Sequence, residues 1–192
     1  MISDTLVFLK NQLNTYLKSI SGIKPDESWE DKVVFLDGEK MDPVSFKLGA
    51  VTVLLVNLER ENTLRAADPY TRTLVDGSLQ KVRPEIRLNL YVLFVARFKQ
   101  YEQGLSYLSA IIKYFQSHQL LNQQNAPELD ESIEQLSIEL ITLPFSEQNE
   151  VWSALRTTYH PSVLYKVKML VFRDEEAGAV SEVKEKILRV PL

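Results

Sequence analysis

The sequence predicts a mixed α+β domain, with a central mixed or antiparallel β-sheet and flanking helices. Apolar residues recur at helical spacing near the N-terminus. Several later segments are rich in β-branched residues or alternate between apolar and polar side chains, as strands do. A chain of 192 residues is long enough to form one large domain with its own core.

Composition excludes several kinds of chemistry. The chain has no cysteine, which excludes thiolate catalysis, disulfides and Cys-based zinc sites. Its formal net charge of -4 lacks the basic excess with which nucleic-acid binders neutralise phosphates, so we expect no nucleic-acid partner. No stretch approaches about 18 uninterrupted apolar residues, and the first residues lack a signal-peptide pattern. We therefore expect a cytoplasmic protein without direct membrane insertion.

Three elements are predicted before residue 59. Residues 3–20 form an amphipathic helix, because their apolar side chains share one helical face and Gly22 follows. Residues 32–36 form a short strand. Residues 47–58 are β-branched and apolar on both faces, which is typical of a central strand covered on both sides.

Residues 59–83 form a long irregular segment with mixed charges, interrupted by Asp-Pro and Asp-Gly pairs. A loop of this length is uncommon inside a compact domain and is often a contact element. Two interpretations stay open. The segment is a solvated excursion that includes a hairpin, or it contacts another molecule.

The middle of the chain predicts a strand followed at once by a helix. Residues 85–96 alternate as a strand, and Asn89 between apolar neighbours is expected to be a buried amide. The helix that follows begins near residue 101 and is expected to pack on this strand. Its predicted apolar stripe comprises Tyr101, Leu105, Leu108, Ile112 and Phe115.

The last third is predicted to contribute two strands and a short helix. Residues 133–142 form a strand, for which we expect Leu136, Ile138 and Leu140 to face inward. Residues 146–157 form a helix that Trp152 anchors in the core, and residues 162–173 form the last clear strand. We expect a domain over residues 1–173 and a charged C-terminal arm over residues 174–192. The pattern of the arm fits a helix or a strand equally well.

No catalytic, cofactor-binding or metal-binding residues are predicted. The glycines do not have the spacing of a phosphate-binding loop. His118 and His160 lie outside any metal-ligand motif, so we expect loop or helix-end positions for them. A cluster of carboxylates is interpreted as a solvated face rather than a glycosidase pair: Glu128, Asp130, Glu131, Glu134 and Glu139.

Three segments together resemble one family. They are PEIRLNLYVLFVARF, YEQGLSYLSAIIKYFQSH and NEVWSALRTTYHPSVLYKVKMLVF, preceded by an opening helix that is also similar. The family is the tail terminator, or cap, protein of contractile injection systems, of the antifeeding-prophage and Photorhabdus virulence cassette type. The resemblance covers about residues 1–173.

The resemblance implies a phage-tail-terminator-like fold and a structural protein rather than an enzyme. It implies a homohexameric ring that closes the baseplate-distal end of the inner tube and contractile sheath. The implied partners are other copies of the chain, the inner tube protein and the sheath protein, in a phage-tail-like particle that stays in the cell or is released. Alternatives are a tail-completion or connector protein elsewhere in the same particle, and a small soluble binding module unrelated to injection particles.

The irregular loop and the C-terminal arm are the predicted contact elements, because of their length and pattern. A closed ring uses a heterologous interface, in which two different patches of each subunit match. The predicted interface residues are Arg60, Arg65, Tyr70, Arg72, Lys81, Arg83, Ile187 and Val190.

Overall fold

The computed structural model describes residues 1–22, 29–38, 44–61, 71–73, 79–81, 86–172 and 178–179. The chain divides into two compact units. The first contains residues 1–60 and 88–170, and the second contains residues 61–87 and 171–192. Within the described residues, no helix is long and apolar enough to cross a lipid bilayer.

The first unit is built on a six-stranded sheet with strand order β1-β2-β5-β8-β7-β6. The strands are β1 (Val33–Phe35), β2 (Ala50–Arg60), β5 (Ile86–Arg97), β6 (Leu120–Asn122), β7 (Gln135–Ile141) and β8 (Ser162–Phe172). β1 pairs with β2 in parallel, whereas the pairs β2–β5, β6–β7 and β7–β8 are antiparallel. The Ala96 amide donates to the Pro161 carbonyl at 2.9 Å, so the end of β5 lies beside the start of β8. The predicted mixed sheet is confirmed, with β2 in its interior.

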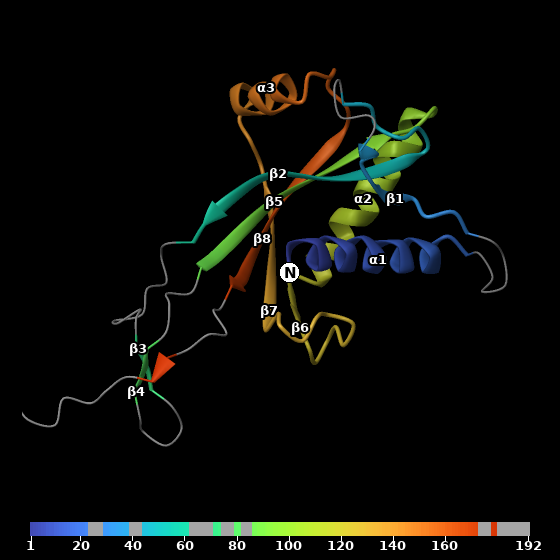
Figure 1. Ribbon diagram of the computed structural model, residues 1–192. Coiled ribbons are helices and arrows are strands. Elements are labelled where there is room, and N and C mark those ends of the chain that lie inside the picture. The colour runs from blue at the N-terminus through green and yellow to red at the C-terminus, as the bar shows by residue number, and fades with distance from the viewer. Residues whose placement is uncertain are drawn as a thin grey trace, which may run out of the picture. The chain divides into compact units, whose positions relative to one another are not determined.

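Helices cover both faces of this sheet. They are α1 (Ile2–Ile20), α2 (Tyr101–Ser117) and α3 (Phe145–Ala154). Figure 1 shows α1 and α2 together on one side of the strands and the short α3 on the other. The three helices were predicted from the sequence to within a few residues. A helix rises about 1.5 Å per residue and a strand about 3.3 Å, so α3 spans less than half the length of β2, β5 or β8. It therefore covers only part of its face of the sheet.

The larger core lies between the sheet and the pair α1–α2. Phe94 from β5 and Phe115 from α2 are both almost fully buried, with ring centroids 5.8 Å apart. Tyr165 from β8 packs against Phe115, with ring centroids 4.7 Å apart. Burial raises the pKa of the Tyr165 hydroxyl to about 12. Each such aromatic side chain contributes about 1.5–3 kcal/mol relative to an exposed one.

The outer edge of β1 is closed by a side chain from α1. Asn14 is buried, its Nδ2 donates to the Val33 carbonyl at 2.8 Å, and its Oδ1 accepts the amides of Lys32 and Val33 at 3.0 and 2.9 Å. The side chain thus takes the place of a neighbouring strand. An edge strand with satisfied backbone groups is a poor template for pairing with another chain.

The predicted apolar stripe of α2 is wrong at its N-terminal end. Tyr101 and Leu105 are 66% and 40% exposed. The helix is rotated so that Gly104 faces the sheet, where it is buried against β5. A Cβ there would lie 3.6 Å from Ala96 Cβ and 3.5 Å from the ring of Phe98. The buried stripe comprises Gly104, Leu108, Ile111, Tyr114 and Phe115.

The prediction for β7 holds for Leu136 and Ile138, which are buried, but is wrong for Leu140, which is 45% exposed. The reason lies in β6, which sequence patterning missed within the polar segment after α2. β6 pairs with β7 only as far as Ser137. Beyond that residue β7 is itself the edge of the sheet, so Leu140 has no strand beside it to cover it.

The second unit contains a three-stranded sheet of order β3-β4-β9. Its strands are β3 (Thr71–Thr73), β4 (Leu79–Lys81) and β9 (Gly178–Ala179), each antiparallel to its neighbour. The hairpin interpretation is therefore correct for the described part of the 59–83 segment. Residues from the predicted C-terminal arm pair with that hairpin. The other residues of 62–85 and of 173–192 lie outside the described ranges.

Candidate functional site

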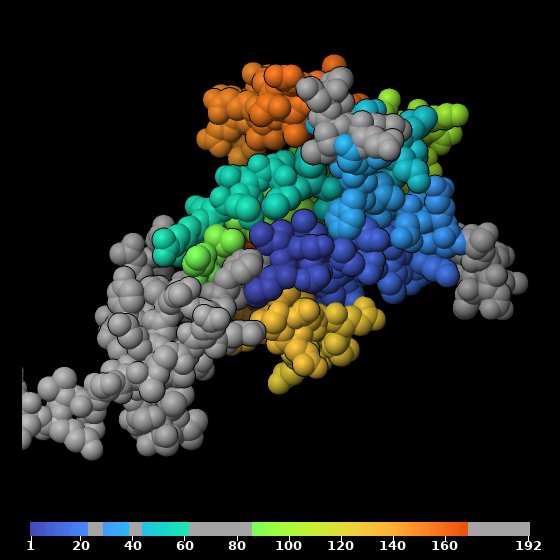
Figure 2. Space-filling view, viewed as in Figure 1, coloured from blue at the N-terminus to red at the C-terminus, as the bar shows by residue number. Residues whose placement is uncertain are grey.

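A groove of about 1130 Å³ opens on the face of the sheet that carries α3. Its floor comes from β2, β5, β8 and the end of β7, and α3 forms one wall. In the space-filling view the surface of α3 (orange) lies beside that of β2 (teal) (Figure 2). Most lining side chains are apolar, among them Val56, Leu143, Val151, Leu155 and Leu164. We call this feature the α3 groove.

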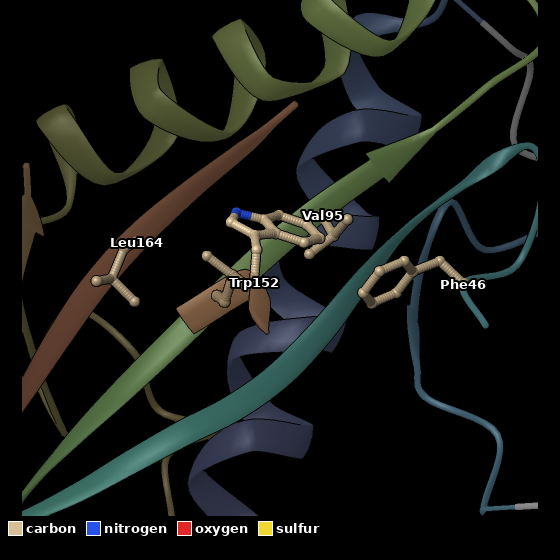
Figure 3. Close-up of a cluster of buried hydrophobic side chains, with 5 residues drawn as sticks. Phe46, Val95, Trp152 and Leu164 are labelled. Atoms are coloured by element: carbon tan, nitrogen blue, oxygen red, sulfur yellow. The ribbon is translucent and has the colours of Figure 1, made fainter. Parts of the chain in front are cut away.

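Trp152 fixes α3 on the sheet and so defines the end of the groove. Its side chain is 5% exposed and packs in a cluster with Phe46, Leu93, Val95 and Leu164 (Figure 3). The Trp152 and Phe46 rings meet edge to face, with centroids 6.0 Å apart. The prediction that Trp152 anchors this helix in the core is confirmed. α3 otherwise buries little, so the groove depends on this one residue.

A β-bulge in β2 shapes the groove floor. Leu55 pairs with Val92, but the next pair is Asn57 with Tyr91, which leaves Val56 as an extra residue. A bulge bends its strand and increases the local twist. The bulged residue Val56 lies within the run of β2 residues 54–57 that lines the groove.

The end of the groove farthest from Trp152 is charged. Lys166 forms an ion pair with Glu59, whose Oε2 also accepts a hydrogen bond from the Tyr91 hydroxyl at 2.9 Å. The hydrogen bond with Lys166 is the main cause that lowers the pKa of Glu59, and the same bond raises the pKa of Lys166. Lys168 forms an ion pair with Glu139. Both lysines on the groove floor are therefore neutralised by carboxylates.

Two carboxylates of α3 complete the rim. Glu147 and Glu150 line the groove and are exposed. Among the described residues, neither of them has an ion pair. The groove thus combines an apolar floor with a net negative rim, a combination suited to binding an apolar surface that carries cations.

The histidines occupy the structural positions expected for them. His118 follows the last turn of α2, where its Nδ1 lies 2.8 Å from the Tyr114 carbonyl and its ring stacks on that of Tyr114. His160 lies in the loop before β8, 5.6 Å from the Phe46 ring. Burial, assisted by the charge of Arg97, lowers the pKa of His160. Within the described ranges, no three His, Asp or Glu side chains are grouped so that they could hold a metal ion.

Comparison with protein families gives one decisive match. The model of the Pvc16 N-terminal domain family matches residues 5–185. The chain belongs to the Pvc16 N-terminal domain family. No protein of known, curated function matches the sequence.

Two solved structures share the fold of this Pvc16 N-terminal domain. One is the PVC sheath/tube terminator, in the extended state, of an extracellular contractile injection system, with a TM-score of 0.60 and 14% identity over 100% of this chain. The other is the tube-terminating cap of the anti-feeding prophage, with a TM-score of 0.54 and 13% identity over 94% of this chain. The chain covers 64% and 59% of those proteins, less than two thirds of either. The predicted tail-terminator fold is confirmed.

The predicted interface residues separate into three groups. Arg60 is exposed at the end of β2, opposite Leu88. Arg72 and Lys81 come together in the sheet of the second unit, where Arg72 pairs with Gln80 and Lys81 pairs with Thr71 and Gly178. Those outside the described ranges are Arg65, Tyr70, Arg83, Ile187 and Val190. Contact of any of these residues with another molecule stays a prediction.

The α3 groove was not predicted from the sequence. One signal was available, because Lys166 and Lys168 place two cations at alternate positions of an otherwise apolar strand. Such a pattern indicates that one face of a strand is open to water over that length. The bulge at Val56 was not predicted from the sequence.

Proposed function

We propose that this Pvc16 N-terminal domain is the ring-forming part of a structural cap. The ring closes the baseplate-distal end of the inner tube and contractile sheath of a phage-tail-like contractile injection system. The observation that carries the proposal is the family match over residues 5–185. The shared fold with a sheath/tube terminator and a tube-terminating cap supports it.

The cap is a homohexamer, and its further partners are the inner tube protein and the sheath protein. The role is structural, not enzymatic: in the described residues the groove carboxylates and lysines form ion pairs or lie at an open rim, without a nucleophile beside a base. Assembly takes place in the cytoplasm, and the chain then remains part of the particle.

The second unit is a contact element of the cap. Its support is the small sheet that joins β3 and β4, from the predicted contact loop, to β9 from the predicted arm. Deletion of residues 174–192 should leave the first unit folded but give particles without caps. Normally capped particles assembled with the truncated chain would contradict this role.

The proposal is tested by producing particles from the tube, sheath and baseplate proteins with and without this chain, followed by electron microscopy. We expect tubes of uniform length with closed ends when the chain is present, and tubes of variable length with open ends when it is absent. Capped tubes of uniform length in its absence would contradict the proposal. Loss of the tube–baseplate junction instead would indicate a connector protein.

A further inference from the structure

We propose that neighbouring copies in the ring contact each other through two different patches of the first unit. The exposed flank of α2 in one copy enters the α3 groove of the next copy. This inference rests on the proposed ring and names its interface. It concerns described residues only, and it differs from the predicted contacts of the loop and arm.

The first patch is the flank of α2, which we define as Tyr101, Leu105, Ile112 and Leu140. Tyr101, Leu105 and Leu140 are 66%, 40% and 45% exposed. Ile112 follows Leu105 by two helical turns and lines two small cavities together with Leu140 of β7, one of which extends to Val151 of α3. Contiguous exposed apolar side chains of this size mark an interaction site more often than isolated ones do.

The second patch is the α3 groove. Its apolar floor matches the recognition mode in which one side of a helix, presenting residues spaced by three, four or seven positions, lies in an apolar groove. Residues 101, 105 and 112 of α2 have such spacing. The groove floor also contains Lys166, whose ammonium group has three donors and is paired with one carboxylate, Glu59.

The charges at the borders of the two patches are complementary. Glu147 and Glu150 give the groove rim an uncompensated negative charge. Lys99, which precedes α2, and Lys113, about one turn before its end, are exposed, against one carboxylate, Glu102, in the first turn. Among the described residues, neither lysine has an ion pair. Complementary rim charges favour the correct partner and orientation more than they add affinity.

The placement of the patches suits a ring. Strand alternation puts Leu140 on the α1–α2 face of β7, whereas Glu139 and Ile141 line the groove on the opposite face. Two different patches of one subunit give a head-to-tail contact, which closes into a ring when the rotation between copies allows it. Two identical patches would give only a two-fold dimer.

Cross-linking of two cysteine variants tests this contact, because the natural chain has no cysteine. One variant is Leu105→Cys in the α2 flank, and the other is Ala154→Cys, an exposed residue of the groove wall. Both are incorporated together into particles with the tube and sheath proteins and treated with a short bis-maleimide. We expect a cross-linked dimer of the chain from the mixture and none from either variant alone.

Asn11→Cys, at an exposed position of α1, replaces Ala154→Cys in the control mixture. A yield from the control as high as that from the test pair would overturn the inference. So would capped particles without any cross-link, or a cross-link from Leu105→Cys to the tube or sheath protein. These outcomes would contradict the proposed interface but not the proposed cap function. Particles that lack this chain at their ends would instead refute the proposed function.

Charge reversal provides an independent readout. Glu150→Lys in the groove copy should lower the cross-link yield about tenfold, because an attraction at the rim becomes a repulsion. Lys113→Glu in the copy that carries Leu105→Cys should restore most of that loss. Equal yields from all combinations would show that these charges do not meet.

Discussion

Replacement of Asn14 by alanine tests how the edge of the sheet is closed. The Asn14 side chain forms three hydrogen bonds with the backbone of β1 and the residue before it, at 2.8, 3.0 and 2.9 Å. Val33, whose amide and carbonyl are two of the partners, is 0% exposed. Alanine would leave these groups without a partner in a place that water does not reach.

The expected cost follows from those partners. A buried backbone group that loses its partner costs about 1–3 kcal/mol, while a group that water can reach costs much less. The amide of Lys32 is only partly buried, so we count the two groups of Val33 fully. Asn14→Ala should therefore lower the free energy of unfolding by about 3 kcal/mol.

Urea unfolding followed by circular dichroism measures this loss. Asn11→Ala is the matched control, because it removes the same side chain from an exposed position of α1. We expect the control to lie within about 0.5 kcal/mol of the natural chain. A free energy of unfolding for Asn14→Ala that equals that of the control would refute the account of the β1 edge.

Three further predictions concern the core. Trp152→Ala should cost about 3–5 kcal/mol in urea unfolding and detach α3, whereas an unchanged midpoint would show that other contacts hold the helix. Gly104→Ala should raise stability by about 0.5–1 kcal/mol, because the new methyl meets only ordinary contacts of 3.5 Å or more; a loss would show that α2 lies closer to β5. Burial raises the pKa of Tyr165 to about 12, so its neutral hydroxyl contributes to the free energy of unfolding. This contribution is complete below pH 10, where the tyrosine of the unfolded chain is also neutral, and it is lost as the pH rises toward 12. Absorbance titration at 295 nm should show late tyrosines, because burial raises the pKa of Tyr114 as well as that of Tyr165, and their absence would contradict the burial.

Periodicity was sufficient for most elements because each records a local environment. The apolar run of β2 predicts coverage on both faces, which holds for Ala50–Val53 but is wrong from residue 54 onward, where the strand is half-buried and then exposed. The stripe of α2 could not be found this way. Its orientation is set by the close approach of Gly104 to β5, and a residue without a side chain adds nothing to an apolar pattern.

The candidate site was less predictable than the fold, because it is formed by residues far apart in the chain. The groove brings together Val56, Tyr91, Ile141, Val151 and Lys166 from different elements. The exposure of Leu140 likewise depends on where a different strand, β6, ends. Sequence patterning describes each strand alone, so it cannot show which neighbour is missing at an edge or where a short helix leaves a face uncovered.

The central claim is that this Pvc16 N-terminal domain caps the distal end of a contractile tube. The most direct measurement is cryo-electron microscopy of particles assembled with the chain carrying a small affinity tag, decorated with a gold-labelled antibody against the tag. We expect label and ring-shaped density of six subunits only at the end opposite the baseplate. Label along the sheath, at the baseplate, or absent from closed ends would contradict the claim.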